Sequence, residues 1–223
     1  PEYHEFLVSN EDGFWVLLRA FLLVGKMETA SLLFDKRYGA SANKQELLEF
    51  GKILSAYGYK PEGEAVLAKL LSVDSTNAEA YFTLANLALK QSFTERLLAG
   101  RNKSSAYSKA LFYAGRASSI DSLNPEYAFF RISILDSMKM VAEGCALCSV
   151  YLETIRPDAK LNKICGAINE KNENYDAALK HWEKAFHVDS FDVDNLLKIE
   201  SAHRRLGTHS SYELTAQERL ANA

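Results

Sequence analysis

Residues 174–192 read NYDAALKHWEKAFHVDSFD and carry the clearest helical pattern in this chain of 223 residues. Small and large apolar side chains recur there three or four positions apart: Tyr175, Ala178, Trp182 and Ala185. This spacing places them along one face of an α-helix. The polar pair Asp189 and Ser190 predicts a turn before the next apolar run begins.

A second helix is expected just before this one. Leu161, Ile164, Cys165 and Ile168 have the same helical spacing and would form its apolar side. Gly166 lies among them, and a residue without a side chain allows two antiparallel helices to approach closely. We therefore interpret the two helices as one helix–turn–helix unit in which small and large residues interlock.

The unit recurs along the chain at a nearly constant period. Gly51 follows Leu18 by 33 residues, Gly58 follows Gly25 by 33, and Ala85 follows Gly51 by 34. Fixed periods of this length are typical of proteins that stack one helical hairpin per repeat. The sequence therefore predicts a single domain, 1–223, of six repeats: 11–43, 44–77, 78–124, 125–158, 159–192 and 193–223. In the third repeat an insertion, 92–109, delays the second helix.

This pattern resembles the tetratricopeptide repeat (TPR) family. Three repeats carry most of the match: Cys165, Gly166, Ala178, Trp182, Ala185 and Ser190 in the fifth, Leu47, Phe50, Gly51, Gly58 and Gly63 in the second, and Tyr81, Leu84, Ala85, Ala110 and Ala117 in the third. The proline that often closes such a repeat occurs only as Pro157 and the nearby Pro125, and Cys145 stands where alanine is expected. The resemblance implies an all-α, right-handed superhelical solenoid. Sel1-like and HEAT-like solenoids stay open as alternatives.

Composition excludes several other classes. The chain is 48% hydrophobic, with four prolines and eleven glycines, which favours a folded helical protein. Its net charge of −3 argues against nucleic acid as a partner. The longest apolar stretch, 14–24, is interrupted by Arg19 and is too short to span a bilayer, so we expect no membrane insertion.

The cysteines predict a reducing compartment. Cys145, Cys148 and Cys165 are odd in number, which argues against a disulfide framework and favours a cytoplasmic location. Cys145 and Cys148 form a CxxC pair, but no second pair and no nearby histidine completes a zinc site. We expect buried, small apolar side chains, with redox or metal chemistry as the alternative. The chain begins at Pro1 without a methionine, so we also expect a processed protein or a piece of a longer one.

The TPR resemblance implies a binding groove lined by the first helix of each repeat. The matching positions are Trp15, Arg19, Leu48, Lys52, Phe82, Asn86, Tyr127, Phe130, Arg131, Ile134, Lys163, Lys171, Leu197, Lys198 and Arg205. An aromatic and apolar half would lead into a basic half, which predicts a protein or peptide partner with acidic and apolar residues. The alternative is that the aromatic side chains only pack between neighbouring helices.

One known TPR function is not supported. Family members that capture a C-terminal carboxylate use a clamp of lysines and asparagines. Asn86 occupies one clamp position, but Phe82 replaces a lysine and Arg131 replaces an asparagine. The insertion carries a separate hypothesis, because Arg96, Arg101 and Lys103 form a basic cluster that could dock an acidic partner. A longer helix pair or a loop is the structural alternative.

No catalytic, cofactor-binding or metal residues are expected. The sequence contains no phosphate-binding loop, nucleophile elbow or HExxH motif, and His181 and His187 would lie on different faces of one helix. We therefore predict a non-catalytic interaction scaffold in an assembly, secretion or chaperone complex. The alternative is an accessory domain of a larger enzyme, such as a glycosyltransferase. RNA binding would require one base-reading set per repeat, which the groove positions do not supply.

Overall fold

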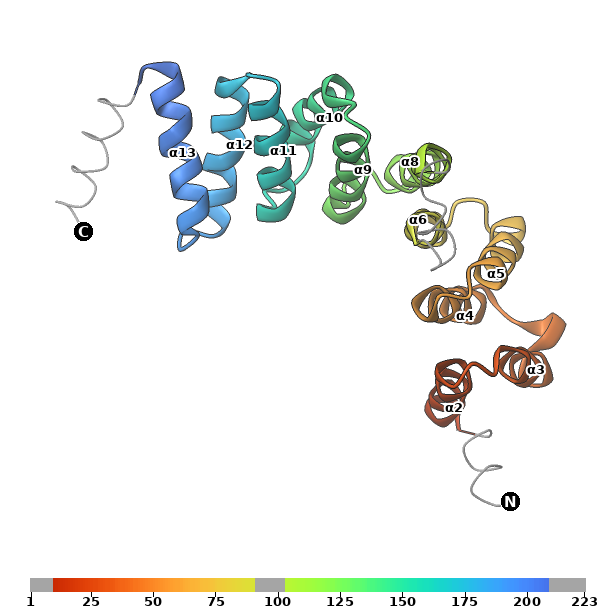
Figure 1. Ribbon diagram of the computed structural model, residues 1–223. Coiled ribbons are helices and arrows are strands. Elements are labelled where there is room, and N and C mark those ends of the chain that lie inside the picture. Colours follow the sequence, from red (N-terminus) through yellow and green to blue (C-terminus); the bar gives the residue numbers. More distant parts are fainter. Residues whose placement is uncertain (1–9, 91–102, 209–223) are drawn as a thin grey trace. The chain divides into compact units, whose positions relative to one another are not determined.

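The computed structural model describes residues 10–90 and 103–208 (Figure 1). These residues form eleven α-helices, one short 3₁₀ helix at Gly39–Ser41 and no strand, so the predicted all-α fold is confirmed for them. The helices are α2 (Glu11–Leu23), α3 (Met27–Arg37), α4 (Lys44–Tyr57), α5 (Lys60–Val73), α6 (Ala78–Leu89), α8 (Lys103–Ile120), α9 (Pro125–Ser137), α10 (Val141–Thr154), α11 (Ala159–Lys171), α12 (Tyr175–Val188) and α13 (Val193–Leu206). None of these helices is long and apolar enough to cross a membrane.

The chain divides into two compact units, Pro1–Tyr113 and Ala114–Ala223, and the boundary falls within α8. In the first unit α2 packs on α3 and α4 packs on α5. In the second unit α9 packs on α10 and α11 packs on α12, while α13 packs on α12. Four of the helical hairpins expected from the sequence, α2–α3, α4–α5, α9–α10 and α11–α12, are therefore present among the described residues, while a single domain with the six stated repeat limits stays a prediction.

Asparagine or aspartate begins every first helix of a hairpin, because its side-chain oxygen accepts a hydrogen bond from an otherwise unsatisfied backbone N–H. These N-caps are Asn10, Asn43 and Asn77 in the first unit and Asn124, Asp158 and Asp192 in the second. Within each unit they lie 33 or 34 residues apart, as the repeat period requires. At α2, for example, the Asn10 side chain accepts from the Gly13 backbone N–H at 3.1 Å.

The turns of the four hairpins α2–α3, α4–α5, α9–α10 and α11–α12 each contain one residue with left-handed backbone geometry. In the first unit this residue is Gly25 or Gly58, with φ of 78° and 85°. In the second unit the turns after α9 and α11 use Lys139 and Glu173, with φ of 60° and 57°. Gly207, with φ of 70°, ends α13. Glycine adopts this geometry at little cost, whereas a residue with a Cβ atom is strained by it.

Aromatic rings and leucines fill the first unit. Phe34 stacks on Phe50 with ring centroids 4.2 Å apart, and Phe14 is fully buried in the same core. Gly51 lies against Leu67, so that a Cβ atom there would lie 2.6 Å from Leu67 Cδ2. The first and second helices of this repeat therefore interlock through a small and a large residue.

The second unit repeats this interlocking but also buries polar groups. Gly166 lies directly against the indole of Trp182, which confirms the close helix approach predicted at Gly166. Three asparagines and one histidine are buried in the same unit: Asn162, Asn169, Asn195 and His181. The core of this unit is therefore partly polar.

Candidate binding groove

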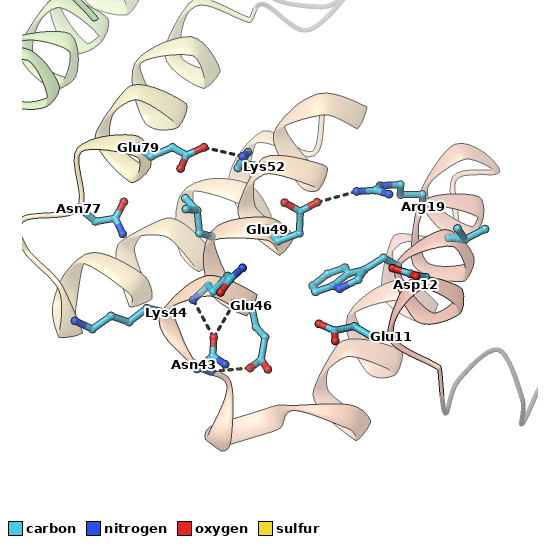
Figure 2. Close-up of a pocket in the computed structure, with 14 residues that line it drawn as sticks. Glu11, Asp12, Arg19, Asn43, Lys44, Glu46, Glu49, Lys52, Asn77 and Glu79 are labelled. Atoms are coloured by element: carbon cyan, nitrogen blue, oxygen red, sulfur yellow. Dashed lines mark hydrogen bonds and ion pairs between the residues drawn. The ribbon is translucent and has the colours of Figure 1, made fainter. Parts of the chain in front are cut away.

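A pocket of about 750 Å³ opens over the first helices of the first unit (Figure 2). Residues of α2 and α4, the N-caps Asn43 and Asn77 and Glu79 of α6 supply its lining. The pocket brings together four residues that the sequence assigned to the groove: Trp15, Arg19, Leu48 and Lys52. The outermost two of these residues, Trp15 and Lys52, are 37 positions apart in the sequence. All four converge because α2, α4 and α6 pack side by side.

Trp15 and Leu48 provide the apolar part of the lining. Both side chains are half-buried and pack against the core of the first unit. The Trp15 ring stacks on Tyr38 with centroids 6.0 Å apart and meets Phe14 edge-on at 5.1 Å. Trp15 therefore both packs between helices and lines the pocket, so the two interpretations of this aromatic residue are compatible.

The basic residues of this pocket are held in ion pairs. Arg19 of α2 donates to Glu49 of α4 at 2.7 Å, and Lys52 of α4 donates to Glu79 of α6 at 2.7 Å (Figure 2). The hydrogen bond to Glu79 raises the pKa of Lys52. Each pair links one first helix to the next, so these cations connect neighbouring repeats and their charges are balanced.

The pocket carries an excess of acidic groups. Its lining contains five carboxylates, Glu11, Asp12, Glu46, Glu49 and Glu79, against three cations, Arg19, Lys44 and Lys52. Lys44 forms a further ion pair with Asp74 at 3.3 Å. Within the part of the chain that the structure describes, no ion pair engages Glu11 or Asp12. This end of the pocket therefore carries net negative charge.

The second unit shows the same pairing between successive first helices. Lys171 of α11 bonds to Asp136 of α9 at 2.6 Å, and Lys198 of α13 bonds to Glu170 of α11 at 2.9 Å. Lys163 pairs with Asp192, the N-cap of α13. Each of the three lysines of the expected basic half is therefore paired with an acid, whereas Arg205 lies over the Tyr175 ring at 6.0 Å. The sequence predicted the cations of the groove but not the carboxylates that pair with them, because each carboxylate lies about one repeat away from its cation and at an irregular separation in the sequence.

A smaller pocket of about 260 Å³ lies over α11, α12 and α13. Its lining is Lys163, Ala167, Trp182, Asp192, Asp194, Asn195 and Lys198. Asn195 is buried and donates from Nδ2 to the Trp182 carbonyl at 2.8 Å, while its Oδ1 has no hydrogen-bond partner among the described residues. The sequence prediction included Lys163 and Lys198 but missed Asn195.

Other predicted groove residues contact their own unit. Asn86 donates to the Phe82 carbonyl at 3.0 Å, and Arg131 donates to Ser118 Oγ at 3.3 Å. Tyr127 is only 8% exposed and so lies in the core of the second unit, and Phe130 is half-buried. Of the docking insertion, Arg96 and Arg101 lie outside the described residues, and Lys103 is the first residue of α8. Lys109, also in the inserted segment, pairs with Glu64 at 2.8 Å.

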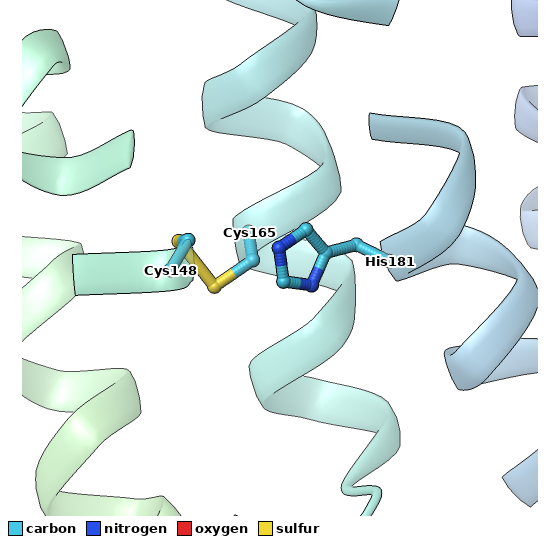
Figure 3. Close-up of side chains that lie close together, drawn as sticks. All are labelled: Cys148, Cys165 and His181. Atoms are coloured by element: carbon cyan, nitrogen blue, oxygen red, sulfur yellow. A yellow bond between two sulfur atoms is a disulfide. The ribbon is translucent and has the colours of Figure 1, made fainter. Parts of the chain in front are cut away.

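Cysteine and histidine side chains meet in the core of the second unit (Figure 3). Cys148 of α10 and Cys165 of α11 form a disulfide, with Cα atoms 5.5 Å apart. The expectation of three thiols is therefore wrong for this pair, and the cysteines no longer support a cytoplasmic location. Cys145 carries a free thiol, and burial raises its pKa. The sequence did not predict this disulfide, because the CxxC motif pointed to Cys145, and not to Cys165, as the neighbour of Cys148.

His181 of α12 lies beside the disulfide (Figure 3). The two sulfur atoms and a ring nitrogen of His181 lie within 4.8 Å of one another. All three residues are buried, and burial, with the charge of Lys184, lowers the pKa of His181 to about 4. The imidazole is therefore neutral near pH 7.

Comparisons with known proteins support the fold. No protein-family model and no curated protein matches the sequence. Several solved structures are similar, among them TTC0263, a TPR protein of Thermus thermophilus (14% identity, TM-score 0.55, covering 86% of this chain and 98% of that one). PilF of Pseudomonas aeruginosa has 16% identity and a TM-score of 0.57 over 95% of this chain and 92% of its own. YrrB, described as a TPR protein with an unusual peptide-binding site, has 15% identity and a TM-score of 0.55 over 74% and 79%. The chain therefore has the fold of the tetratricopeptide repeat proteins, as its repeat pattern predicted.

Proposed function

We propose that this chain is a non-catalytic interaction scaffold that binds an extended peptide segment of a protein partner in the pocket over α2, α4 and α6. The observation that carries this proposal is the half-buried Trp15, whose ring is fixed by the core and also lines an open pocket. Tryptophan is among the side chains that contribute most to protein interfaces. A ring that is already fixed loses little conformational entropy when a ligand covers it.

The size of the pocket suits a few residues of a peptide. Ligand pockets commonly enclose about 300 to 1,000 Å³, and this one encloses about 750 Å³. Trp15 and Leu48 offer the apolar contact, and the ion pairs Arg19–Glu49 and Lys52–Glu79 form a polar surround. The peptide-binding site described for YrrB is consistent with such a ligand for this fold.

The charges favour a basic residue in the peptide. Because Arg19 and Lys52 are already paired, an acidic ligand would have to displace Glu49 or Glu79. Glu11 and Asp12 instead present negative charge at the end of the pocket. We therefore replace the acidic partner expected from the sequence with a segment that places an apolar side chain on Trp15 and a lysine or arginine near Glu11.

A peptide-library selection with the whole chain tests this proposal. The chain has two tryptophans, and Trp182 is buried in the second unit, so a ligand-induced change in fluorescence reports on Trp15. We expect selected peptides to combine apolar and basic residues. Because Trp15→Ala removes this fluorescent reporter, isothermal titration calorimetry compares the affinities of wild type and variants. Trp15→Ala should weaken peptide binding at least about fivefold, which corresponds to about 1 kcal/mol.

Phe112→Ala is the matched control. Phe112 is an aromatic residue of α8 that is 62% exposed and does not line the pocket, so its loss should leave binding unchanged. Circular dichroism of each variant establishes that the helices are intact. Wild-type affinity in a folded Trp15→Ala variant would contradict the pocket assignment.

A further inference from the structure

The cluster of Cys148, Cys165 and His181 is the strongest candidate for a further site. Its three donors come from three consecutive helices, α10, α11 and α12, and lie within 4.8 Å of one another. The two cysteines are 0% exposed and His181 is 2% exposed. Two sulfurs and one imidazole nitrogen form a donor set that soft transition metals prefer.

Hydrogen bonds orient the imidazole for coordination. Asn162 donates from Nδ2 to the Asp158 carbonyl at 2.9 Å, which leaves its Oδ1 facing His181 Nδ1 at 2.9 Å. An amide oxygen only accepts hydrogen bonds, so His181 Nδ1 carries the proton and Nε2 carries the lone pair. Figure 3 shows the His181 ring pointing toward the Cys165 side chain. An outer partner that fixes the tautomer in this way is typical of metal-binding histidines.

We propose that, when the disulfide is reduced, Cys148, Cys165 and His181 bind one Cu(I) ion. Metal–donor distances of roughly 2.0 to 2.3 Å hold neighbouring donors roughly 3.5 to 4 Å apart, so the three donors need only small shifts once the S–S bond is broken. Among the described residues the cluster offers three donors, and its burial leaves little room for water. Zn(II) sites are almost always four-coordinate, whereas thiolate and imidazole ligands also suit Cu(I).

The disulfide and the metal exclude each other. A dithiol reductant gives one hydrogen atom to each cysteine sulfur and itself becomes a disulfide, so the S–S bond breaks and two thiols form. Cu(I) then binds as the thiols release up to two protons and become thiolates. In the oxidised chain the two sulfur atoms are bonded to each other, so neither is a thiolate that could bind a metal ion. The site is therefore available only in the reduced chain.

Anaerobic titration of the full chain with Cu(I), supplied as its acetonitrile complex, tests this site. The chain is first reduced with a dithiol, which is then removed. We expect one Cu(I) per reduced chain by native mass spectrometry, and an ultraviolet thiolate-to-copper absorption band. The oxidised wild type should bind none, and this control requires no substitution. Competition with a chromophoric chelator then ranks the affinities of the variants and of Zn(II).

Single substitutions distinguish the three proposed copper ligands from a nearby cysteine that is not a ligand. Cys148→Ser, Cys165→Ser and His181→Gln should each lose at least the roughly tenfold affinity that even an outer partner contributes. Cys145→Ser is the matched control, because its thiol lies three positions earlier on α10 and faces the Ile168 carbonyl at 3.7 Å. Circular dichroism verifies folding. The proposal is overturned if the reduced wild type binds no Cu(I), if Cys145→Ser abolishes binding, or if Zn(II) binds more tightly.

Discussion

In the first unit the buried polar side chains among the described residues are the hydroxyls of Ser55 and Thr83, whereas the second unit buries three amides and an imidazole in addition to the hydroxyl of Ser118. Each buried amide of the second unit donates to a backbone carbonyl: Asn162 to Asp158, Asn169 to Cys165 and Asn195 to Trp182. Burying such a group without a partner costs about 1 to 3 kcal/mol. The same hairpin geometry is therefore filled by apolar contacts in one unit and partly by directed hydrogen bonds in the other.

This difference separates two kinds of candidate site. The apolar core of the first unit packs against Trp15 on one side. The Trp15 side chain also lines the open pocket in which we propose that a partner binds. The polar core of the second unit instead directs donor atoms inward, toward Cys148 and Cys165. A core of apolar side chains offers no donors, so it can support a surface site but cannot form an internal one.

Overpacking the second unit should have the largest effect. Gly166→Leu places a side chain where the Trp182 indole lies, and we expect a loss of stability of about 3 kcal/mol, at the upper end of the range for overpacked cores. Urea denaturation measures the change. An unchanged midpoint of the urea transition would contradict the close approach of the two helices at Gly166, and with it the repeat register that we assigned from this approach.

Gly115→Ala is the control for that substitution. Gly115 also lies within a helix of the second unit, but a Cβ atom there would come no closer than 3.9 Å to Arg131. Alanine favours helices over glycine by about 0.5 to 1 kcal/mol. We therefore expect Gly115→Ala to be neutral or slightly stabilising, which would show that the space at Gly166, and not the loss of a glycine, causes the effect.

The buried imidazole predicts a pH dependence of the stability of the second unit, whereas the described residues of the first unit, 10–90 and 103–113, include no histidine. In the unfolded chain His181 binds a proton below about pH 6.5, but in the folded chain its pKa is about 4. Acidification therefore favours unfolding, and stability present above pH 6.5 is lost as the pH falls toward 4. Between pH 7 and pH 5 the loss should be about 2 kcal/mol for the oxidised, metal-free chain.

His181→Gln isolates this contribution, because carboxylates titrate alike in both proteins and cancel in the difference. His187→Gln is the matched control, since His187 lies on the same helix but is exposed. We expect the control to keep the wild-type pH dependence and His181→Gln to flatten it. Parallel stability curves for wild type and His181→Gln between pH 7 and pH 5 would show that the imidazole is not buried as described.

The hairpins could be predicted from the sequence because they depend on local signals. Apolar spacing and glycines such as Gly58 recur with the repeat, and so do the cap residues Asn10, Asn43 and Asn77. The left-handed turns at Lys139 and Glu173 could not be predicted, because neither residue type favours that geometry. There the packing of the two helices determines the backbone.

The sites were only partly predictable. Trp15 and Leu48 follow from the family positions, since residues at equal places in successive first helices must lie side by side. The charges did not follow, because an ion pair such as Lys52–Glu79 depends on which rotamers two exposed side chains adopt. The cluster of Cys148, Cys165 and His181 also escaped prediction. Cys148 and His181 are 33 residues apart, which is one repeat, and only the packing of α10, α11 and α12 brings them together.

The turns provide the smallest effect and the most direct comparison of the two units. Gly58 and Glu173 both end a first helix in left-handed geometry, with φ of 85° and 57°. Gly58→Ala introduces a Cβ atom into that geometry and should cost about 1 kcal/mol, although nothing lies within 4 Å of the position. Glu173→Gly relieves the same strain, but glycine also gains entropy in the unfolded chain, so we expect a net stabilisation of about 0.5 kcal/mol. Thermal melts of the two single variants measure both signs. If Glu173→Gly were as destabilising as Gly58→Ala, Glu173 would have to contribute contacts that outweigh its backbone strain, and the turns of the two units would not be equivalent.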